Sequence, residues 1–386
     1  MKHQHSAVRQ HDDVRPDYDV VVLGGGPAGL AAAIAIRQQY QLSVLLVERQ
    51  AQGINRVGEN CPPETVLLLK RLGVAKAFYR DAHQTCPGYA SVWGRDDVGY
   101  NDFIVNPMGP SWRLDRQRFD ATLANRAQAL GVDLLWTTRF EHVESGHHNN
   151  DRNSSNNFRL HFSNTRDKTT FTVGAGFVID ASGFQAIFAK ALGVEKHIDD
   201  QLFATVRFAE VEHGKHSQQI HLEALPQAWC YHTLLPDQRA VSMIVTEKPQ
   251  LEPLRANDYQ GLEQALSNTR FIGSRLEKLQ LKNASYHIFP IRSGQLSQVE
   301  GQHWMAIGDA ALSFDPIAAQ GVYKALSHGL MSAEKIGQWL TQEKQSQQYS
   351  TYIDHQYQQY RANRQHVYGL EQRWMGEGFW QRRTAK

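Results

Sequence analysis

The sequence predicts an α/β fold that combines a parallel sheet of the βαβ type with a second, antiparallel sheet. Residues 18–48 contain two apolar runs, 20–23 and 44–47, separated by a glycine-rich turn and an alanine-rich helical segment. This is the order of a βαβ unit. The antiparallel sheet is predicted from four short strand-like segments, which are 203–211, 219–223, 229–235 and 240–246.

The glycine-rich turn predicts a dinucleotide site. Gly24, Gly26 and Gly29 fit the spacing G-x-G-x-x-G, in which the first glycine allows the turn, the second allows close approach of a pyrophosphate, and the third allows close helix packing. Glu48 follows the second strand, where a carboxylate can hold ribose hydroxyls. An ordinary glycine-rich turn is the alternative. The predicted contacts at this unit are Gly24, Gly26, Pro27, Ala28, Gly29, Glu48 and Arg49.

Composition excludes several classes of protein. The 386 residues carry a formal net charge of +2, which predicts no nucleic-acid partner, and no apolar run approaches the roughly 20 residues of a membrane span. The three cysteines lack metal-ligand spacing, so no metal site is predicted. The first 17 residues are polar and lack the apolar stretch of a signal peptide, which predicts a flexible tail and a cytoplasmic protein.

The order of the segments predicts two domains that share one continuous chain. A buried strand at 177–180 and another at 304–307 return the chain to the first sheet. We therefore expect a discontinuous nucleotide-binding domain, a substrate domain and a C-terminal helical segment. After the tail at 1–17, the nucleotide-binding domain comprises 18–85, 110–200 and 300–340. The substrate domain comprises 86–109 and 201–299, and the C-terminal helical segment comprises 341–386.

Two charged residues outside the turn are candidates for ligand contacts. Glu59 lies in a loop just ahead of a helix that begins after Pro62 and Pro63, so its carboxylate faces either a ligand or nearby backbone N–H groups. Arg118 falls in the first turn of a helix, where a cation is unfavourable with the helix dipole. A nearby anionic ligand would offset that cost, and a surface position is the alternative.

Three motifs together resemble a known superfamily. The opening turn, Asp180-Ala181-Ser182-Gly183, and Gly308-Asp309-Ala310 followed by Asp315-Pro316 occur in the order seen in FAD-dependent monooxygenases. The chain resembles the aromatic-hydroxylase superfamily, in the branch of flavin-dependent tryptophan halogenases and geranylgeranyl-reductase-like proteins. The resemblance implies a Rossmann-like FAD-binding domain of the glutathione-reductase type. It also implies FAD contacts from Arg118, Asp180, Gly183, Gly308, Asp309, Pro316, Gln320, Gly321 and Val322.

Within this superfamily the sequence departs from the halogenases. Their lysine that captures hypohalous acid has no counterpart in the corresponding stretch 88–93, and the glutamate of their later loop is replaced by Ala318-Ala319-Gln320. The halogenase signature W-x-W-x-I-P is only echoed at 229–236. These departures put halogenation in doubt.

The C-terminus resembles flavoproteins that modify a tryptophan in another protein. The segments 368–375 and 379–383, which contain Trp374 and Trp380, resemble the ending of the GoxB, LodB and QhpG type, which builds the cysteine tryptophylquinone of amino-acid oxidases. This resemblance implies that the substrate and partner is the precursor of a quinone-cofactor oxidase, such as a glycine oxidase. Because tryptophan and arginine are enriched at binding hot spots, this tail is either a partner surface or a structural clasp.

The implied reaction is oxygen insertion into an indole. NADH or NADPH reduces FAD, O2 then gives a C4a-hydroperoxide, and the electron-rich ring attacks its distal oxygen. Glu59, His232 and His287 are candidates for proton exchange, and Trp229 and Tyr231 are candidates for the substrate pocket. Each has a structural alternative. Rival functions are hydroxylation or halogenation of free tryptophan or another small aromatic metabolite, reduction of polyprenyl chains, and a flavin-containing chaperone without catalysis.

Overall fold

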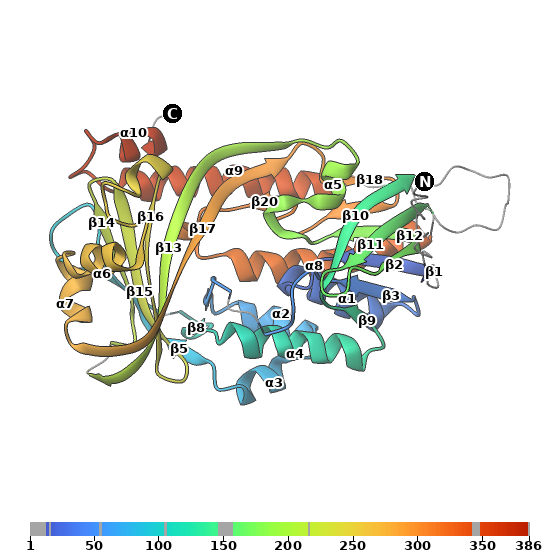
Figure 1. Ribbon diagram of the computed structural model, residues 1–386, viewed down its shortest axis with the longest axis horizontal. Coiled ribbons are helices and arrows are strands. Elements are labelled where there is room, and N and C mark those ends of the chain that lie inside the picture. Colours follow the sequence, from blue (N-terminus) through green and yellow to red (C-terminus); the bar gives the residue numbers. More distant parts are fainter. Residues whose placement is uncertain are drawn as a thin grey trace, which may run out of the picture.

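The computed structural model describes residues 13–14, 17–53, 56–103, 106–145, 157–214, 217–341 and 348–384. Two large sheets lie at opposite ends of an elongated molecule (Figure 1). Two long strands, β13 (Lys196–Gly214) and β17 (Leu279–Leu296), connect the two ends, and two long helices, α8 (Gly321–Leu340) and α9 (Gln348–Gly369), run beside them. The expected mixed α/β architecture is therefore present.

The nine-stranded sheet contains the predicted βαβ unit. Strand β2 (Tyr18–Leu23), helix α1 (Pro27–Gln39) and strand β3 (Val44–Val47) follow one another, and β2 pairs in parallel with β3 and with β12 (Thr170–Asp180). The other main strands are β9 (Asp133–Leu135), β10 (Thr138–Ser145), β11 (Phe158–Asn164), β18 (Glu300–Gly301) and β19 (Trp304–Ala306). Their apolar side chains form the largest buried cluster.

Helix α8 packs directly on α1, and a glycine makes this approach possible. A Cβ at Gly329 would lie 2.6 Å from Ala31 Cβ and 2.7 Å from Ala28 O, so only glycine fits between the two helices. This contact places the N-terminus of α8 beside the N-terminus of α1. The predicted tail at 1–17 is partly ordered, because β1 (Asp13–Val14) pairs in parallel with β12; the rest of that tail, except residue 17, lies outside the described residues.

The eight-stranded sheet contains the predicted antiparallel strands. Its order is β20-β17-β13-β16-β15-β14-β6-β7, and its shorter strands are β6 (Gly88–Val92), β7 (Gly99–Asp102), β14 (Ile220–Leu225), β15 (Ala228–Leu235), β16 (Arg239–Thr246) and β20 (Leu312–Ser313). Helices α6 (Tyr259–Ser267) and α7 (Phe271–Leu276) cover one face. The outer half of strand β17, residues 279–287, contains no buried side chain, and the buried side chains of this strand lie in its last four residues.

Short elements connect the two sheets on one side of the molecule. A three-stranded sheet consists of β4 (Asn60–Cys61), β8 (Ser111–Arg113) and β5 (Gln84–Cys86). The helices around it are α2 (Thr65–Arg71), α3 (Ala75–Arg80) and α4 (Arg116–Ala129). Elsewhere lie α5 (Ile187–Ala191) and the 3₁₀ turns η2 (Gly183–Gln185), η3 (Lys248–Gln250) and η4 (Pro316–Ala318).

The C-terminal segment packs against the body of the protein. Helix α10 (Gly378–Thr384) follows α9, and the side chains of Phe379 and Trp380 are fully buried. Trp380 Nε1 donates to Leu225 O at 2.9 Å, and its ring lies edge-on to Trp93 at 5.2 Å. The aromatic residues of this tail are therefore part of the core beneath the eight-stranded sheet.

Candidate active site

One large cavity, of about 690 Å³, extends between the two sheets. At one end it is lined by the β2–α1 turn and the end of β3, and at the other by side chains of β13, β15, β16 and β17. The turn and the wall of the antiparallel sheet, which lie far apart in the sequence, thus face the same space.

The geometry of the turn explains two of its glycines. Gly24 has φ +119°, and a Cβ there would lie 2.2 Å from Ala181 O. A Cβ at Gly29 would lie 2.0 Å from Gly24 O. The Gly25 N–H donates to Glu48 Oε2 at 2.9 Å, which ties the turn to the end of β3. These contacts between protein atoms hold the backbone of the turn in place and leave no room for larger side chains at Gly24 and Gly29.

Gly26 differs from its neighbours because it faces open space. It is the N-cap of α1, no described side chain caps that position, and a Cβ there would first meet Arg56 Nη1 at 3.2 Å. The N-terminus of a helix with free N–H groups favours an anion, and the guanidinium groups of Arg56 and Arg116 line the same end of the cavity. This end suits a pyrophosphate, and Glu48 and Arg49 lie next to it.

Arg118 does not reach the cavity. Its side chain is 44% exposed, and its guanidinium pairs with Asp237 at 2.5 Å and lies 3.8 Å from Asp115 Oδ2. Arg116, two residues earlier on α4, lines the cavity and donates to Val57 O at 2.6 Å. Side chains two residues apart point to different sides of a helix. The cation that lines the cavity is therefore Arg116, two residues before the predicted Arg118.

We expect the two arginines to differ in their effect on FAD retention. Arg116→Ala should weaken FAD binding about tenfold or more, since one charge-assisted contact is worth about 1.5–3 kcal/mol. Arg118→Ala should change it less than about twofold, because that side chain pairs with Asp115 and Asp237 and does not line the cavity. Flavin fluorescence titration of the apoproteins measures both. A larger loss in Arg118→Ala would restore the assignment made from the sequence.

The opposite end of the nucleotide region is formed by two loops and the N-terminus of α8. The expected residues that line the cavity here are Gly183, Asp309, Pro316, Gln320, Gly321 and Val322. Two others lie behind it. Asp180 is fully buried, and its Oδ2 accepts from the N–H groups of Phe188 and Ala189 at 2.9 and 3.0 Å. Gly308 donates its N–H to His328 Nδ1 at 3.1 Å. Asp180 and Gly308 thus support the loops from behind.

Asp309 is paired with a buried lysine that sequence reasoning missed. Lys324 Nζ lies 2.7 Å from Asp309 Oδ1, and the Lys324 side chain is 1% exposed. Desolvation alone would raise the pKa of the Asp309 carboxyl, but the Lys324 ammonium outweighs it and the pKa lies below its ordinary value. The carboxylate is therefore ionised and available to accept hydrogen bonds from a polyhydroxyl chain. Asp309 and Lys324 are separated by β20 and the 3₁₀ turn η4, so no local spacing in the sequence indicated this pair.

The wall on the antiparallel sheet is apolar and aromatic. Trp229 and Tyr231 of β15 both face the cavity, as predicted for residues that share one face of a strand. Their cavity-facing neighbours include Ala204, Val241, Met243, Phe289 and Ile291. Asn60 and Tyr89 add a polar corner, in which Asn60 Nδ2 donates to Tyr89 Oη at 2.6 Å. This wall can hold a flat apolar ring and exclude water.

Neither candidate histidine lies at the cavity. His232 is buried on the opposite face of β15, and its Nδ1 lies 2.9 Å from Ser242 Oγ. The period of two along a strand explains this, since His232 cannot share a face with Tyr231. His287 is exposed and does not line the cavity, although its ring packs beside Phe208 and beside Phe289, which does line it. The structure therefore corrects the expectation that either histidine meets a ligand here.

Glu59 is the candidate acid that the structure does bring to the cavity. It is 6% exposed, its Oε2 accepts from Gly58 N at 3.2 Å, and its Oε1 has no hydrogen-bond partner among the described residues. Burial raises the pKa of the Glu59 carboxyl above its ordinary value, although the nearby Arg116 guanidinium opposes this rise. The site thus contains a buried carboxyl that can give or take a proton.

Replacing Glu59 with glutamine should stabilise the FAD-free protein at alkaline pH. Because the pKa of Glu59 is raised in the folded protein, this protein still holds the proton at pH values where the unfolded chain has released it. The free energy of unfolding therefore falls as the pH rises above the pKa of the unfolded chain, until the folded carboxyl also ionises. Relative to wild type, Glu59→Gln should gain on the order of 1 kcal/mol at pH 8 and little at pH 4. Urea unfolding at both pH values measures this, with the exposed Glu252→Gln as control. An equal effect at both pH values would contradict the shift.

One cluster of metal-ligand side chains occurs among the described residues, away from the cavity. It consists of His142, Glu144 and His161 on the exposed β10–β11 pair. The two imidazole rings stack at 4.0 Å with an interplanar angle of 9°. Their ring-plane lone pairs therefore lie side by side and do not converge on an ion at the usual 2.0–2.1 Å.

Comparisons with known proteins agree with the geometry of the cavity. Residues 17–365 match the family described as FAD binding domain. The FAD-dependent oxidoreductase LodB of Marinomonas mediterranea is 26% identical and aligns over 95% of this chain and 97% of its own length. Other relatives, at 22–28% identity, are flavin-dependent halogenases, including a brominase of Pseudoalteromonas luteoviolacea.

Two solved structures share the fold. The myxobacterial chondrochloren halogenase CndH has a TM-score of 0.83 at 21% identity and covers 96% of this chain and 87% of its own. The peptidyl tryptophan dihydroxylase QhpG, essential for tryptophylquinone cofactor biogenesis, has a TM-score of 0.70 at 22% identity and covers 95% and 78%. None of the helices in the described part of the chain is long and apolar enough to cross a membrane. Because this family model matches most of the chain, the chain belongs to the FAD-binding domain family.

Proposed function

We propose that this protein is an FAD-dependent monooxygenase that hydroxylates a tryptophan side chain of a precursor protein during maturation of a cysteine tryptophylquinone cofactor. The observation that carries the proposal is the single cavity that joins the dinucleotide turn at Gly26 to the aromatic wall at Trp229 and Tyr231. A ring on that wall would lie at the same cavity as the N-terminus of α8.

The choice of a protein-bound tryptophan draws on three likenesses. LodB matches almost the whole chain, QhpG is described as a peptidyl tryptophan dihydroxylase, and the C-terminus resembles this group. The partner would then be the precursor of a quinone-cofactor amino-acid oxidase. The chain departs from the halogenases at the stretch 88–93, which has no lysine, and at Ala318-Ala319-Gln320, where Ala319 and Gln320 line the cavity.

Each part of the cavity has a task in this reaction. The N–H groups at Gly26, with Arg56 and Arg116, would bind the pyrophosphate, and Glu48 would bind a ribose. Asp309 would accept hydrogen bonds from the ribityl chain, and the positive end of α8 would stabilise negative charge on a reduced ring system. Bound FAD, reduced by NADH or NADPH, supplies the activation of O2.

The remaining residues act on the substrate. The apolar wall of Trp229, Tyr231, Met243 and Phe289 would orient an indole and keep water away from the reacting centre. Glu59, with its unpartnered oxygen and raised pKa, would hold or release the proton that oxygen transfer requires. In this proposal the indole is the nucleophile, so no nucleophilic side chain of the enzyme is needed.

A small-molecule halogenase is the second candidate, and the likeness to CndH and the curated halogenases favours it. The test supplies reductant, O2 and halide with free tryptophan, with a polyprenyl substrate or with the unmodified precursor. It follows NAD(P)H and O2 consumption and the mass of each product. We expect consumption to rise only with the precursor and no halogenated product to form. Formation of chloro- or bromotryptophan would establish a halogenase. NAD(P)H oxidation that depends on a polyprenyl substrate and takes up no O2 would establish the reductase. No NAD(P)H or O2 consumption with any substrate would favour the chaperone.

A further inference from the structure

A tyrosine hydroxyl on the C-terminal helix α9 connects two parts of the cavity lining. Trp229 Nε1 donates to Tyr368 Oη at 3.1 Å, and Tyr368 Oη donates to Asp315 Oδ2 at 2.8 Å. All three side chains are at most 1% exposed. Burial raises the pKa of Tyr368 well above its ordinary value, so the hydroxyl keeps the proton that it donates. The hydroxyl is therefore the bridge between the aromatic wall and the loop before α8.

Asp315 determines the shape of that loop. Its Oδ1 accepts from Ile317 N at 3.0 Å, which caps the 3₁₀ turn, and its own N–H donates to Tyr360 Oη at 2.9 Å. The turn ends at Ala319 in the left-handed region, with φ +50°, and α8 begins two residues later. Residues 315–317 and 319–322 line the cavity. A shift of Asp315 would therefore move the N-terminus of α8 that faces the ligand.

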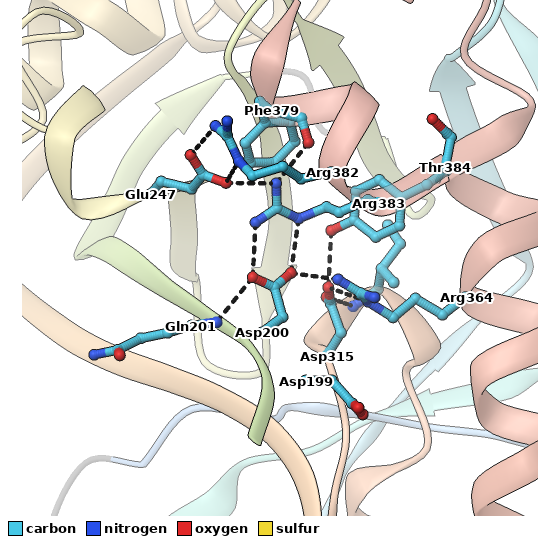
Figure 2. Close-up of polar contacts among 12 residues, drawn as sticks. Asp199, Asp200, Gln201, Glu247, Asp315, Arg364, Phe379, Arg382, Arg383 and Thr384 are labelled. Atoms are coloured by element: carbon cyan, nitrogen blue, oxygen red, sulfur yellow. Dashed lines mark hydrogen bonds and ion pairs between the residues drawn. The ribbon is translucent and has the colours of Figure 1, made fainter. Parts of the chain in front are cut away.

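An ionic cluster holds α9 and α10 in the position that this bridge requires. Arg383, whose side chain is 1% exposed, lies 2.8 Å from Asp200 Oδ2 and 3.0 Å from Glu247 Oε1 (Figure 2). Arg364 pairs with Asp200 and lies 3.5 Å from Asp315 Oδ2. The guanidinium groups thus connect both C-terminal helices to β13, to the end of β16 and to Asp315 itself.

We propose that Tyr368 is a positioning residue that couples the aromatic wall at Trp229 to the loop at Asp315, so that the C-terminal helices complete the FAD site although they contribute no residue to the cavity lining. The inference rests on the assignment of this cavity to FAD. It does not depend on the substrate or on the type of oxidation. Tyr368→Phe removes the bridging hydroxyl alone, leaving the Trp229 N–H unpartnered and Asp315 Oδ2 with only the long contact to Arg364.

The experiment compares Tyr368→Phe with a matched control on the same helix. Tyr357 is also buried, and its hydroxyl also donates to a carboxylate, Asp199 Oδ2 at 2.6 Å, but neither residue lines the cavity. We expect Tyr368→Phe to weaken FAD binding about tenfold and to shift the visible spectrum of the bound flavin. Tyr357→Phe should leave both within twofold and unshifted. Equal behaviour of the two variants would overturn the proposal.

A second variant breaks the same bridge from the other side. Trp229→Phe keeps an aromatic ring in the wall but removes the N–H donor, and we expect the same spectral shift as in Tyr368→Phe. In the double variant the two losses of FAD affinity should combine to less than their product, because both remove one shared contact. Fully multiplicative losses would overturn the coupling. If Tyr368→Phe proves too unstable to purify, Trp229→Phe alone tests the bridge, and an FAD affinity and flavin spectrum equal to those of wild type would overturn the proposal. Both readouts use FAD binding without turnover, so a failure of the proposed hydroxylation would leave them unaffected.

Discussion

Gly26→Val is expected to weaken the affinity for FAD about a hundredfold, which corresponds to about 2.7 kcal/mol of binding free energy. The valine side chain would occupy the space through which a pyrophosphate approaches the N-terminus of α1. The FAD-free fold should survive, since the backbone of Gly26 is extended (φ −82°, ψ −179°) and the first atom that a Cβ meets is the flexible end of Arg56. The helix cap itself should lose only about 1 kcal/mol.

The control for this variant is Gly29→Ala. Its Cβ would lie 2.0 Å from Gly24 O, so it should damage the fold of the turn and not only the binding of ligand. Equilibrium unfolding of both apoproteins, with flavin titration of each, separates the two effects. Unchanged FAD affinity in Gly26→Val would mean that the pyrophosphate does not approach the β2–α1 turn.

Trp380→Ala is expected to have the largest effect on stability, at about 3–5 kcal/mol. The indole is fully buried, contacts the rings of Trp93, Tyr368 and Phe379, and donates to Leu225 O. Its removal would leave both a cavity and an unpaired backbone carbonyl. Because Tyr368 is one of its neighbours, FAD affinity should fall as well.

The neighbouring Met375→Ala provides the comparison. Met375 belongs to the same tail but is 53% exposed, so its replacement should change the free energy of unfolding by less than about 0.5 kcal/mol. Denaturant midpoints measure both variants. A Trp380→Ala protein as stable as wild type would contradict the buried position of the tail.

Local patterns in the sequence predicted the part of the site that is built locally. The glycine turn, Glu48 and the alternation of Trp229 and Tyr231 depend on neighbouring residues, and the structure has the βαβ unit and the strand where they were expected. The same period of two already placed His232 on the other face, so this candidate could have been excluded from the sequence.

Other features depend on contacts between distant segments. Whether Arg116 or Arg118 faces the cavity follows from how α4 packs. Arg116 continues the buried stripe of α4 by helical spacing and Arg118 does not, so the periodicity of the helix could have separated the two. The bridge at Tyr368 joins a strand of the eight-stranded sheet, the loop before α8 and helix α9, which lie far apart in the sequence. The sequence leaves the tail open between partner surface and clasp, and the buried Phe379, Trp380 and Arg383 show that its last helix packs into the core.

The most direct test of the central claim is the mass of the precursor protein after reaction. Purified enzyme loaded with FAD, NADH or NADPH, O2 and the unmodified precursor should yield a product whose mass has increased by one or two oxygen atoms, located by peptide mass spectrometry on one tryptophan. Free tryptophan under the same conditions should be unchanged. Robust hydroxylation of free tryptophan, with no mass gain on the precursor, would contradict the account.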